Sequence, residues 1–330
     1  MHVLVGMPVF NEAATIGDVV ARVPRKIEGV DDVSIVVVDD GSSDDSGKLA
    51  RASGAHVVRH PRNAGLGVAF QTMVQYALSV KADLLVTLDG DGQFNPNDIA
   101  TLIQPILQGR ALVCTASRFA DPDKTPVMPW VKKWGNRRVA GLVNMLTGQR
   151  FADVSCGFRA YTREALLRLT VYASFTYTHE TFLDLAAKRI PIVEVPVVVR
   201  GVREHGQSKM ASSVLRYGTR TAKIMLLTYR DQAPLRLCGW IALVFVLAGV
   251  GLLGWSFARL QATGEWLKWA AFMGGAFVAV AVMTLFFGFM ADIAARLRRN
   301  QEEILYWLRR NADPPSPGTV QPPAASSPVP

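Results

Sequence analysis

Short apolar runs alternate with stretches of helical periodicity over roughly the first third of the chain. These runs are rich in Val, Ile and Leu and predict strands at 2–10, 33–40, 56–59, 84–89 and 112–117. Continuous apolar strands separated by helices are typical of a parallel sheet whose two faces are both covered. The pattern therefore predicts an α/β domain.

Polar clusters follow three of the predicted strands. Their sequences are PVFNE at 8–12, VVDDGSSD at 37–44 and VTLDGDGQ at 86–93. In an open α/β sheet, ligands bind outside the carboxyl ends of the strands. We therefore expect the functional groups of this chain to meet at that edge of the sheet.

The middle of the chain continues the α/β pattern and then becomes strongly basic. It predicts helices at Trp134–Thr147 and near His179–Lys188 and a strand at Ile192–Val199. The stretch 200–236 carries eight Lys or Arg residues against two acidic ones, and 212–227 mixes apolar with basic residues. This mixture predicts an amphipathic helix on an anionic membrane face.

Two segments without charge come next, Leu237–Ala258 and Trp269–Ala291. At about 1.5 Å rise per residue, each spans roughly 33 Å, enough for a bilayer core. The alternative is a pair of buried helices in a soluble protein. Because two such segments occur in tandem, with Trp near their ends, we expect a transmembrane hairpin.

The distribution of basic residues predicts the orientation of this hairpin. Lys and Arg lie before the first span and after the second, at Arg296, Arg298 and Arg299, whereas the connecting loop is short. By the positive-inside rule, the N-terminal domain and both termini are expected to face the cytoplasm. The predicted divisions are a domain at 1–210, a juxtamembrane segment at 211–235, the spans within 236–297, and a tail at 298–330 that is disordered from about 313.

Net charge limits the partners. The chain carries a formal charge of +9 with a pI near 9.7, which favours an anionic partner. The basic residues crowd beside the apolar segments without interleaved aromatic residues, so nucleic acid is not expected. The three cysteines have neither a zinc-ligand spacing nor an even number for disulfides, and we expect a reducing compartment.

The sequence Asp89-Gly90-Asp91, followed by Gln93, ends a predicted strand. Hard oxygen ligands at this spacing suit Mg²⁺ or Mn²⁺ bound together with a diphosphate, because such ions are usually held by one or two carboxylates plus substrate phosphates. Asp-Gly pairs are also ordinary turn residues. The position at the end of an apolar strand favours metal binding.

The clusters at 8–12 and 39–42 end strands of the first βαβ unit. Their carboxylates are suited to accept hydrogen bonds from a base or ribose; the alternative for Asp40-Gly41-Ser42 is a turn with a helix cap. A GxGxxG motif is missing, which argues against a dinucleotide site. The segment RNAGLG at 62–67 precedes a helix and is a candidate for binding phosphate through backbone N–H groups.

Seven motifs, taken together and in order, resemble those of family 2 glycosyltransferases of the dolichol-phosphate mannose synthase type. This type includes bacterial polyprenyl-phosphate relatives with a C-terminal membrane hairpin. The motifs are PVFNE, VVDDGSSD, RNAGLG, LDGDGQ, SRF, DVSCGFRAY and REHGQSK. The resemblance covers residues 1 to about 297. It implies a GT-A fold and inverting transfer of a sugar from a nucleotide-diphosphate-sugar donor to a polyprenyl phosphate. The donor is expected at Pro8, Phe10, Glu12, Val37, Asp39, Asp89 and Gly90, the metal at Asp89, Asp91 and Gln93, and phosphates at Arg118, Arg203 and Lys209.

The chemistry explains the need for basic residues. A lipid phosphate has a second pKa of about 6, so it is an anionic nucleophile at neutral pH and needs no strong general base. The protein must supply a cationic cradle, for which Arg118, Arg137, Arg203 and Lys209 are candidates. For Arg137 a solvated surface charge is equally compatible with the sequence.

Two further positions carry ionisable groups. Asp153 is expected either to orient an arginine or the acceptor, or to form a structural salt bridge with Arg159. Asp91, Arg118 and Asp153 are the predicted catalytic set. His179-Glu180 invites an acid/base role but also fits the start of a helix.

Alternative functions have different signatures. A processive polysaccharide synthase would need more spans and a QxxRW motif, which is missing. Transfer to another membrane or saccharide acceptor, or a nucleotide-sugar-binding membrane protein without catalysis, stays open. Self-association into a homo-oligomer is compatible with the sequence, and the donor base, the sugar and the lipid length are not encoded in these motifs.

Overall fold

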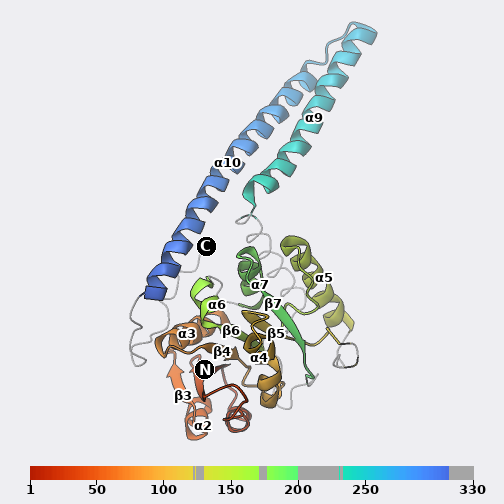
Figure 1. Cartoon of the computed structure of the whole chain (residues 1–330). Helices are drawn as coiled ribbons and strands as arrows, with labels where there is room; N and C mark the ends of the chain where they lie inside the picture. Colours follow the sequence, from red (N-terminus) through yellow and green to blue (C-terminus); the bar gives the residue numbers. More distant parts are fainter. Residues whose placement is uncertain (122, 124–129, 171–176, 200–229, 231–232, 312–330) are drawn as a thin grey trace. The chain divides into compact units, whose positions relative to one another are not determined.

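The structure is a computed structural model that describes residues 1–121, 123, 130–170, 177–199, 230 and 233–311 (Figure 1). The chain divides into two compact units. The first comprises Met1–Ala222 with Tyr306–Pro330, and the second comprises Lys223–Leu305. The predicted amphipathic segment 212–227, the candidates Arg203 and Lys209, and the predicted disordered tail lie outside the described residues.

A seven-stranded sheet forms the centre of the described part of the first unit. Its strands are β1 (His2–Val9), β2 (Asp32–Asp39), β3 (His56–Arg59), β4 (Leu84–Thr87), β5 (Val113–Ser117), β6 (Arg159–Thr162) and β7 (Ile192–Pro196). Their order in the sheet is β3-β2-β1-β4-β6-β5-β7. The β6 strand runs antiparallel to both β4 and β5, and the other neighbouring pairs are parallel.

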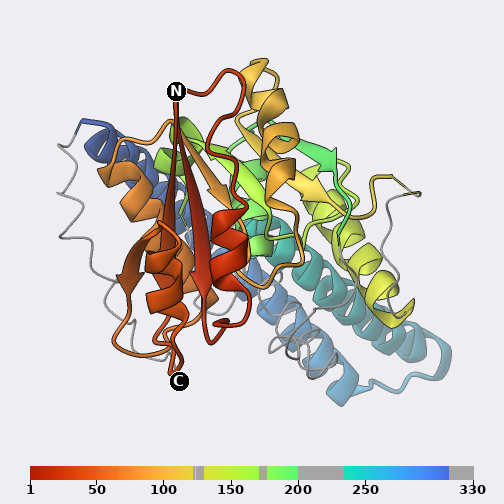
Figure 2. The ribbon, with the colours of Figure 1, turned by 90° about the horizontal axis from the view of Figure 1, so that it is seen from below.

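Helices cover both faces of this sheet (Figures 1 and 2). One face is covered by α1 (Ile16–Ala21), α2 (Ser46–Ala52) and α4 (Ile99–Leu107), and the other by α3 (Leu66–Ser79), α6 (Arg163–Arg168) and α7 (Thr178–Ala187). Successive residues of a strand point to opposite faces. Val3 and Val5 of β1 accordingly belong to one buried cluster and Leu4 to the other, which is why the strand is apolar throughout.

The predicted α/β fold is confirmed, with strand ends that differ by at most three residues from those expected. The strand that sequence reasoning missed is β6 (Arg159–Thr162), which begins inside the DVSCGFRAY motif at 153–161. It has four residues and begins with Arg159, so it lacks the apolar run that identified the other strands. The sheet is therefore mixed rather than wholly parallel. Helix α5 (Trp130–Thr147) also begins four residues before its predicted start.

Two long helices follow the first domain, α9 (Pro234–Thr263) and α10 (Lys268–Asn311). Both are long and apolar enough to cross a membrane, with mean hydropathy of 2.4 and 2.2 in their most apolar windows. Their apolar side chains point outward: Leu247 is 66% exposed and Phe286 is 60% exposed. A helix in the core of a soluble protein would bury such residues, so these helices suit a lipid environment.

Small residues let α9 and α10 approach closely in the second unit. A Cβ atom on Gly249 would lie 2.8 Å from the Gly274 carbonyl oxygen, and one on Gly274 would lie 2.9 Å from that of Gly249. Such contacts between small residues are typical of membrane helix pairs. The helices extend beyond the predicted spans, and residues 298–311, which sequence analysis assigned to the tail, continue α10.

The end of α10 belongs to the first unit and contacts α6. The Tyr306 hydroxyl lies 3.1 Å from both carboxylate oxygens of Glu164, and the guanidinium of Arg168 lies 4.5 Å from the Tyr306 ring centroid. Arg309 donates to the carbonyl oxygen of Leu169 at 3.1 Å. Arg309 therefore satisfies a backbone acceptor just beyond the C-terminal end of α6.

Candidate active site

Hydrogen bonds connect the loop after β1 to the loop after β2. Asn11 adopts the left-handed conformation, with φ of 55°, and its side-chain oxygen accepts the N–H of Ser43 at 2.8 Å. The N–H of Glu12 donates to the Ser46 hydroxyl at 2.8 Å. These bonds bring the PVFNE and DDGSSD motifs together at one edge of the sheet, where sequence analysis placed them.

Asp39 and Asp40 have different environments. Asp39 is fully buried and accepts the N–H of Ser42 at 2.8 Å, while its other carboxylate oxygen lies 3.5 Å from Arg59 Nε. Asp40 accepts the N–H groups of Ala64 and Gly65, each at 2.9 Å. Two N–H groups of the RNAGLG segment are thus bound to Asp40, so the prediction that they bind phosphate is wrong for these two.

The other predicted nucleotide contacts are placed unevenly. Pro8 and Phe10 are half-buried at the carboxyl end of β1, as is Glu12 in the following loop. Val37 is fully buried and packs in the hydrophobic core. Its side chain is enclosed by other core residues, and its place in the predicted donor set stays a prediction.

The Asp89-Gly90-Asp91 turn is tightly packed beneath its carboxylates. The Thr15 hydroxyl donates to the Gly90 carbonyl at 2.8 Å, and a Cβ atom on Gly90 would lie 2.9 Å from Val9. Asp91 is 3% exposed and its Oδ1 accepts the N–H of Gln93 at 3.0 Å. These contacts hold the predicted metal ligands at the edge next to the loops after β1 and β2.

Space beside Asp89 is kept open by a glycine. A Cβ atom on Gly157 would lie 3.3 Å from one Asp89 carboxylate oxygen, 3.5 Å from the other and 3.4 Å from the Tyr177 hydroxyl. The Gly157 carbonyl is held by Thr87 Oγ1 at 2.7 Å and by Tyr177 Oη at 3.2 Å. The Asp89 carboxylate therefore has room that any other residue at 157 would reduce.

These residues fit a Mg²⁺ or Mn²⁺ ion that shares its ligands with a diphosphate. Within the described ranges no group of three or more His, Cys, Asp or Glu residues is arranged to hold a metal. The protein would contribute the two hard carboxylates of Asp89 and Asp91, with Gln93 nearby, and substrate phosphates and water would supply the remaining oxygens. The donor set suits these ions and does not suit zinc.

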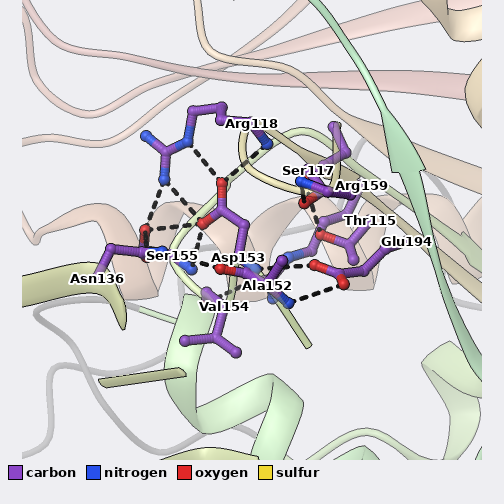
Figure 3. Close-up of polar contacts among 12 residues, drawn as sticks. Thr115, Ser117, Arg118, Asn136, Ala152, Asp153, Val154, Ser155, Arg159 and Glu194 are labelled. Atoms are coloured by element: carbon purple, nitrogen blue, oxygen red, sulfur yellow. Dashed lines mark hydrogen bonds and ion pairs between the residues drawn. The ribbon is translucent and has the colours of Figure 1, made fainter. Parts of the chain in front are cut away.

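Arg118 and Asp153 form a bidentate ion pair (Figure 3). Arg118 Nε donates to Asp153 Oδ2 at 2.6 Å, and Nη2 donates to Asp153 Oδ1 at 2.9 Å and to Ser155 Oγ at 2.6 Å. Burial alone would raise the pKa of Asp153, but the Arg118 charge and hydrogen bonds hold this pKa below its ordinary value. Asp153 therefore orients an arginine, and that arginine is Arg118 rather than Arg159.

Arg159 has a structural environment instead. It is 1% exposed, and its guanidinium donates to the carbonyl oxygens of Thr178 and Val154 and to the Thr181 hydroxyl. It also lies 4.4 Å from the centroid of the Phe182 ring. These contacts connect β6 to α7, and Arg159 is enclosed in the core.

His179 is buried beside this arginine. Only 1% of its surface is exposed, and burial, reinforced by the Arg159 charge, lowers its pKa to about 4. The imidazole is neutral at physiological pH and enclosed, so the structure favours a packing role over acid/base catalysis.

The pKa of His179 predicts a loss of stability in mild acid. The unfolded chain takes up a proton near its ordinary pKa of about 6.5, whereas the folded protein does so only near 4, so stability falls as pH decreases between these values. Across this whole pH range the free energy of unfolding falls by about 3 kcal/mol. We expect the melting temperature to decrease less between about pH 7 and pH 5 in His179→Gln than in the wild type. The melting temperatures would be measured by differential scanning fluorimetry. Equal decreases in the two proteins would contradict the lowered pKa of His179.

A groove lies beside the Arg118–Asp153 pair along α5. Its volume is about 440 Å³, and it is lined by Phe119, Lys133, Asn136, Arg137, Ala140, Gly141, Asn144, Phe151 and Ala152. Lys133 and Arg137 are exposed, so two cations border a groove with several apolar walls. Asn136 connects it to the ion pair, because its side-chain oxygen accepts the Ser155 hydroxyl at 2.9 Å.

The family model described as "Glycosyl transferase family 2" matches residues 4–170, which include the loops after β1 and β2, the Asp89-Gly90-Asp91 turn and the Arg118–Asp153 pair. The chain belongs to glycosyltransferase family 2. It is therefore a glycosyltransferase, in agreement with the resemblance carried by its motifs.

Two curated relatives are similar to this chain over more than half of its length. The undecaprenyl-phosphate 4-deoxy-4-formamido-L-arabinose transferase of Sodalis glossinidius is 30% identical over 296 residues, which cover 86% of this chain and 82% of the relative. The polyprenol monophosphomannose synthase of Mycolicibacterium smegmatis is 30% identical over 223 residues, covering 64% of this chain and 82% of the relative.

A solved structure confirms the GT-A fold of this glycosyltransferase. The crystal structure of glucosyl-3-phosphoglycerate synthase from Mycobacterium tuberculosis, in complex with Mn²⁺, UDP and glucosyl-3-phosphoglycerate, superposes with a TM-score of 0.53 at 23% identity. The superposition covers 70% of this chain and 79% of that one. At this level of identity the comparison concerns the fold alone.

Sequence reasoning missed several polar residues around the ion pair. Glu194 on β7 and Asn136 and Asn144 on α5 all bind the segment that carries Asp153. Glu194 interrupts the apolar strand Ile192–Pro196, and this isolated charge is the signal that would have identified it. The two asparagines are eight residues apart and so lie on one helix face, but their partners are not evident from spacing.

Proposed function

We propose that this glycosyltransferase transfers a sugar from a nucleotide-diphosphate-sugar to a polyprenyl phosphate at the membrane surface. The proposal rests on two features that occur in one chain. The first is a sheet edge that carries Asp89, Asp91 and the Arg118–Asp153 pair. The second is a pair of helices apolar enough to span a membrane. A relative named for an undecaprenyl-phosphate acceptor is similar over 86% of the chain, which supports the same acceptor class.

In this reaction a phosphate oxygen of the lipid forms a bond to C1 of the sugar as the bond from C1 to the nucleoside diphosphate breaks. The electron pair of the broken bond leaves with the diphosphate oxygen, so the departing nucleoside diphosphate gains one negative charge. A divalent ion held by Asp89 and Asp91, with Gln93 nearby, would neutralise charge on that group. Attack from the face opposite the leaving group would invert the configuration at C1.

The protein's own residues bring two anions together. Arg118 is fixed by Asp153 yet 22% of its side chain is exposed, so it can contact a phosphate while its orientation is maintained. Arg137 and Lys133 on α5 would attract the acceptor phosphate to the adjacent groove. Asp39 at the end of β2 and Glu12 in the loop after β1 are the proposed donor contacts.

The membrane is part of the mechanism because a polyprenol tail does not leave the bilayer at useful rates, given about 0.8 kcal/mol per buried methylene. We place α9 and α10 across the membrane, with the catalytic unit and both termini on the cytoplasmic side, as the distribution of Arg and Lys favours. Arg203 and Lys209 remain proposed phosphate contacts, and self-association stays a prediction.

A transfer assay tests the proposal. Purified full-length protein in detergent would be incubated with undecaprenyl phosphate, Mg²⁺ or Mn²⁺, and a panel of radiolabelled UDP- and GDP-sugars. We expect a labelled, organic-extractable lipid with at least one donor and none without divalent metal. A donor panel that yields only free sugar or a water-soluble glycoside would exclude the polyprenyl-phosphate acceptor.

A further inference from the structure

Glu194 binds the segment that presents Asp153, from a strand that sequence analysis treated only as part of the sheet. Its Oε2 accepts the N–H of Ala152 and its Oε1 accepts the N–H of Asp153, each at 2.8 Å (Figure 3). Glu194 lies on β7 opposite Thr115 of β5, the strand that ends directly before Arg118. One carboxylate therefore connects the β5–β7 pair to the backbone of the residue that holds Arg118.

Only a carboxylate satisfies this geometry fully. The two N–H groups belong to consecutive residues, and each requires an acceptor oxygen. Glutamine would place an NH₂ group against one of them, which would lose one hydrogen bond and oppose two donors. Burial raises the pKa of Glu194, and the N–H groups of Ala152 and Asp153 act against this rise.

The same segment is held from its other side by α5. Asn136 Nδ2 donates to the Ala152 carbonyl at 3.0 Å, and Asn144 binds both the N–H and the carbonyl of Phe151, at 2.8 and 2.9 Å. The backbone at 151–153 is therefore bound on both sides before Asp153 reaches Arg118. Asp153 then directs the guanidinium through two parallel hydrogen bonds.

We propose that Glu194 is a positioning residue for sugar transfer, which acts by fixing the Asp153 backbone and thereby the orientation of Arg118. It need not touch either substrate. This inference rests on the proposed function only for its kinetic consequence, because the orientation of Arg118 can be measured without turnover. The alternative is a clamp that supports only folding of β7 against the 151–155 segment.

Kinetics and chemical modification separate these roles. The test compares the full chain in detergent as wild type, Glu194→Gln and Glu164→Gln. The last is a matched control because Glu164 also accepts hydrogen bonds, from Tyr306 and Arg168, on α6. We expect Glu194→Gln to lower kcat by about 10- to 100-fold with donor KM within about twofold, since small errors of placement cost this much. The control should turn over as the wild type does.

Modification by phenylglyoxal, quantified at each arginine by peptide mass spectrometry, reports on Arg118 directly. We expect Arg118 to react several-fold faster in Glu194→Gln than in the wild type or the control, with the exposed Arg110 as the internal reference. Unchanged reactivity of Arg118, or unchanged kcat, would overturn the proposal. If the wild type transfers no sugar to the lipid, the proposed function fails and the labelling alone decides the role of Glu194.

A melting curve of each variant accompanies these measurements. If Glu194→Gln does not fold, Glu194→Asp replaces it, because this variant keeps the charge but is one methylene too short to reach both N–H groups. The same kinetic and labelling changes are then expected. Failure of both variants to fold would assign Glu194 to folding and refute the positioning role.

Discussion

Replacing Arg118 with lysine should lower kcat/KM for lipid-linked sugar formation by roughly 100-fold while the protein stays folded. Lysine keeps the positive charge next to the buried Asp153 carboxylate, so that carboxylate is not left unpaired. It cannot reproduce the two parallel hydrogen bonds to Asp153 together with the one to Ser155. The charge would therefore remain, but its direction towards a substrate phosphate would be lost.

Arg110→Lys is the matched control, because Arg110 precedes β5 at the amino end of the strand whereas Arg118 follows it at the carboxyl end. Arg110 is exposed, and its Nε donates to the side-chain oxygen of the neighbouring Gln108 at 2.9 Å. Steady-state kinetics with varied donor and varied lipid should show the loss in Arg118→Lys alone. Wild-type kinetics in Arg118→Lys would mean that charge suffices and that the bidentate geometry has no role in transfer.

Arg118→Ala should behave differently in stability. Removing one member of a buried pair typically costs 3–5 kcal/mol because the other charge stays buried, so we expect this variant to melt at a markedly lower temperature than Arg118→Lys. A comparison of the two by scanning fluorimetry separates the loss of direction from the loss of charge.

The sequence was sufficient for the parts of the fold that depend on local patterns. The run from His2 to Val9 is apolar because its residues face two different cores, and this made β1 and its neighbours predictable. The turn at Asp89-Gly90-Asp91 was predictable for the same reason, since it follows a fully buried strand. Polar residues at the ends of such strands meet because parallel strands share one carboxyl edge.

Features that depend on long-range pairing were not predictable. Asp153 is near Arg159 in sequence, and this proximity suggested a salt bridge, yet its carboxylate pairs with Arg118 from the end of β5. Asp40 was read as a turn or nucleotide residue, whereas it holds Ala64 and Gly65, about 25 residues away. Which partner a buried carboxylate finds is decided by strand order, and the antiparallel β6 strand was the element that sequence analysis lacked.

Replacing Asp91 with asparagine should lower the rate of transfer by roughly 100- to 1,000-fold and weaken Mn²⁺ binding. Asparagine has nearly the same size and retains an oxygen that can accept the Gln93 N–H, so the turn should be preserved. The substitution removes one negative charge from the site. Within the described residues, no cluster of three His, Cys, Asp or Glu residues could hold a metal. A site that holds a metal ion through two carboxylates loses much of its affinity for the ion when one of them becomes neutral.

The matched control is Asp83→Asn, because Asp83 precedes β4 at the opposite end of the strand that Asp89 and Asp91 follow, and its carboxylate accepts the N–H of His2 at 2.7 Å. Mn²⁺ binding in the presence of UDP, followed by the loss of the free-ion paramagnetic resonance signal, gives a readout independent of turnover. We expect the apparent Kd to rise by at least about tenfold in Asp91→Asn and to stay unchanged in Asp83→Asn. Equal Mn²⁺ affinity with lost activity would instead assign Asp91 to the sugar or the phosphate, since the charge would then matter to the substrate and not to the metal.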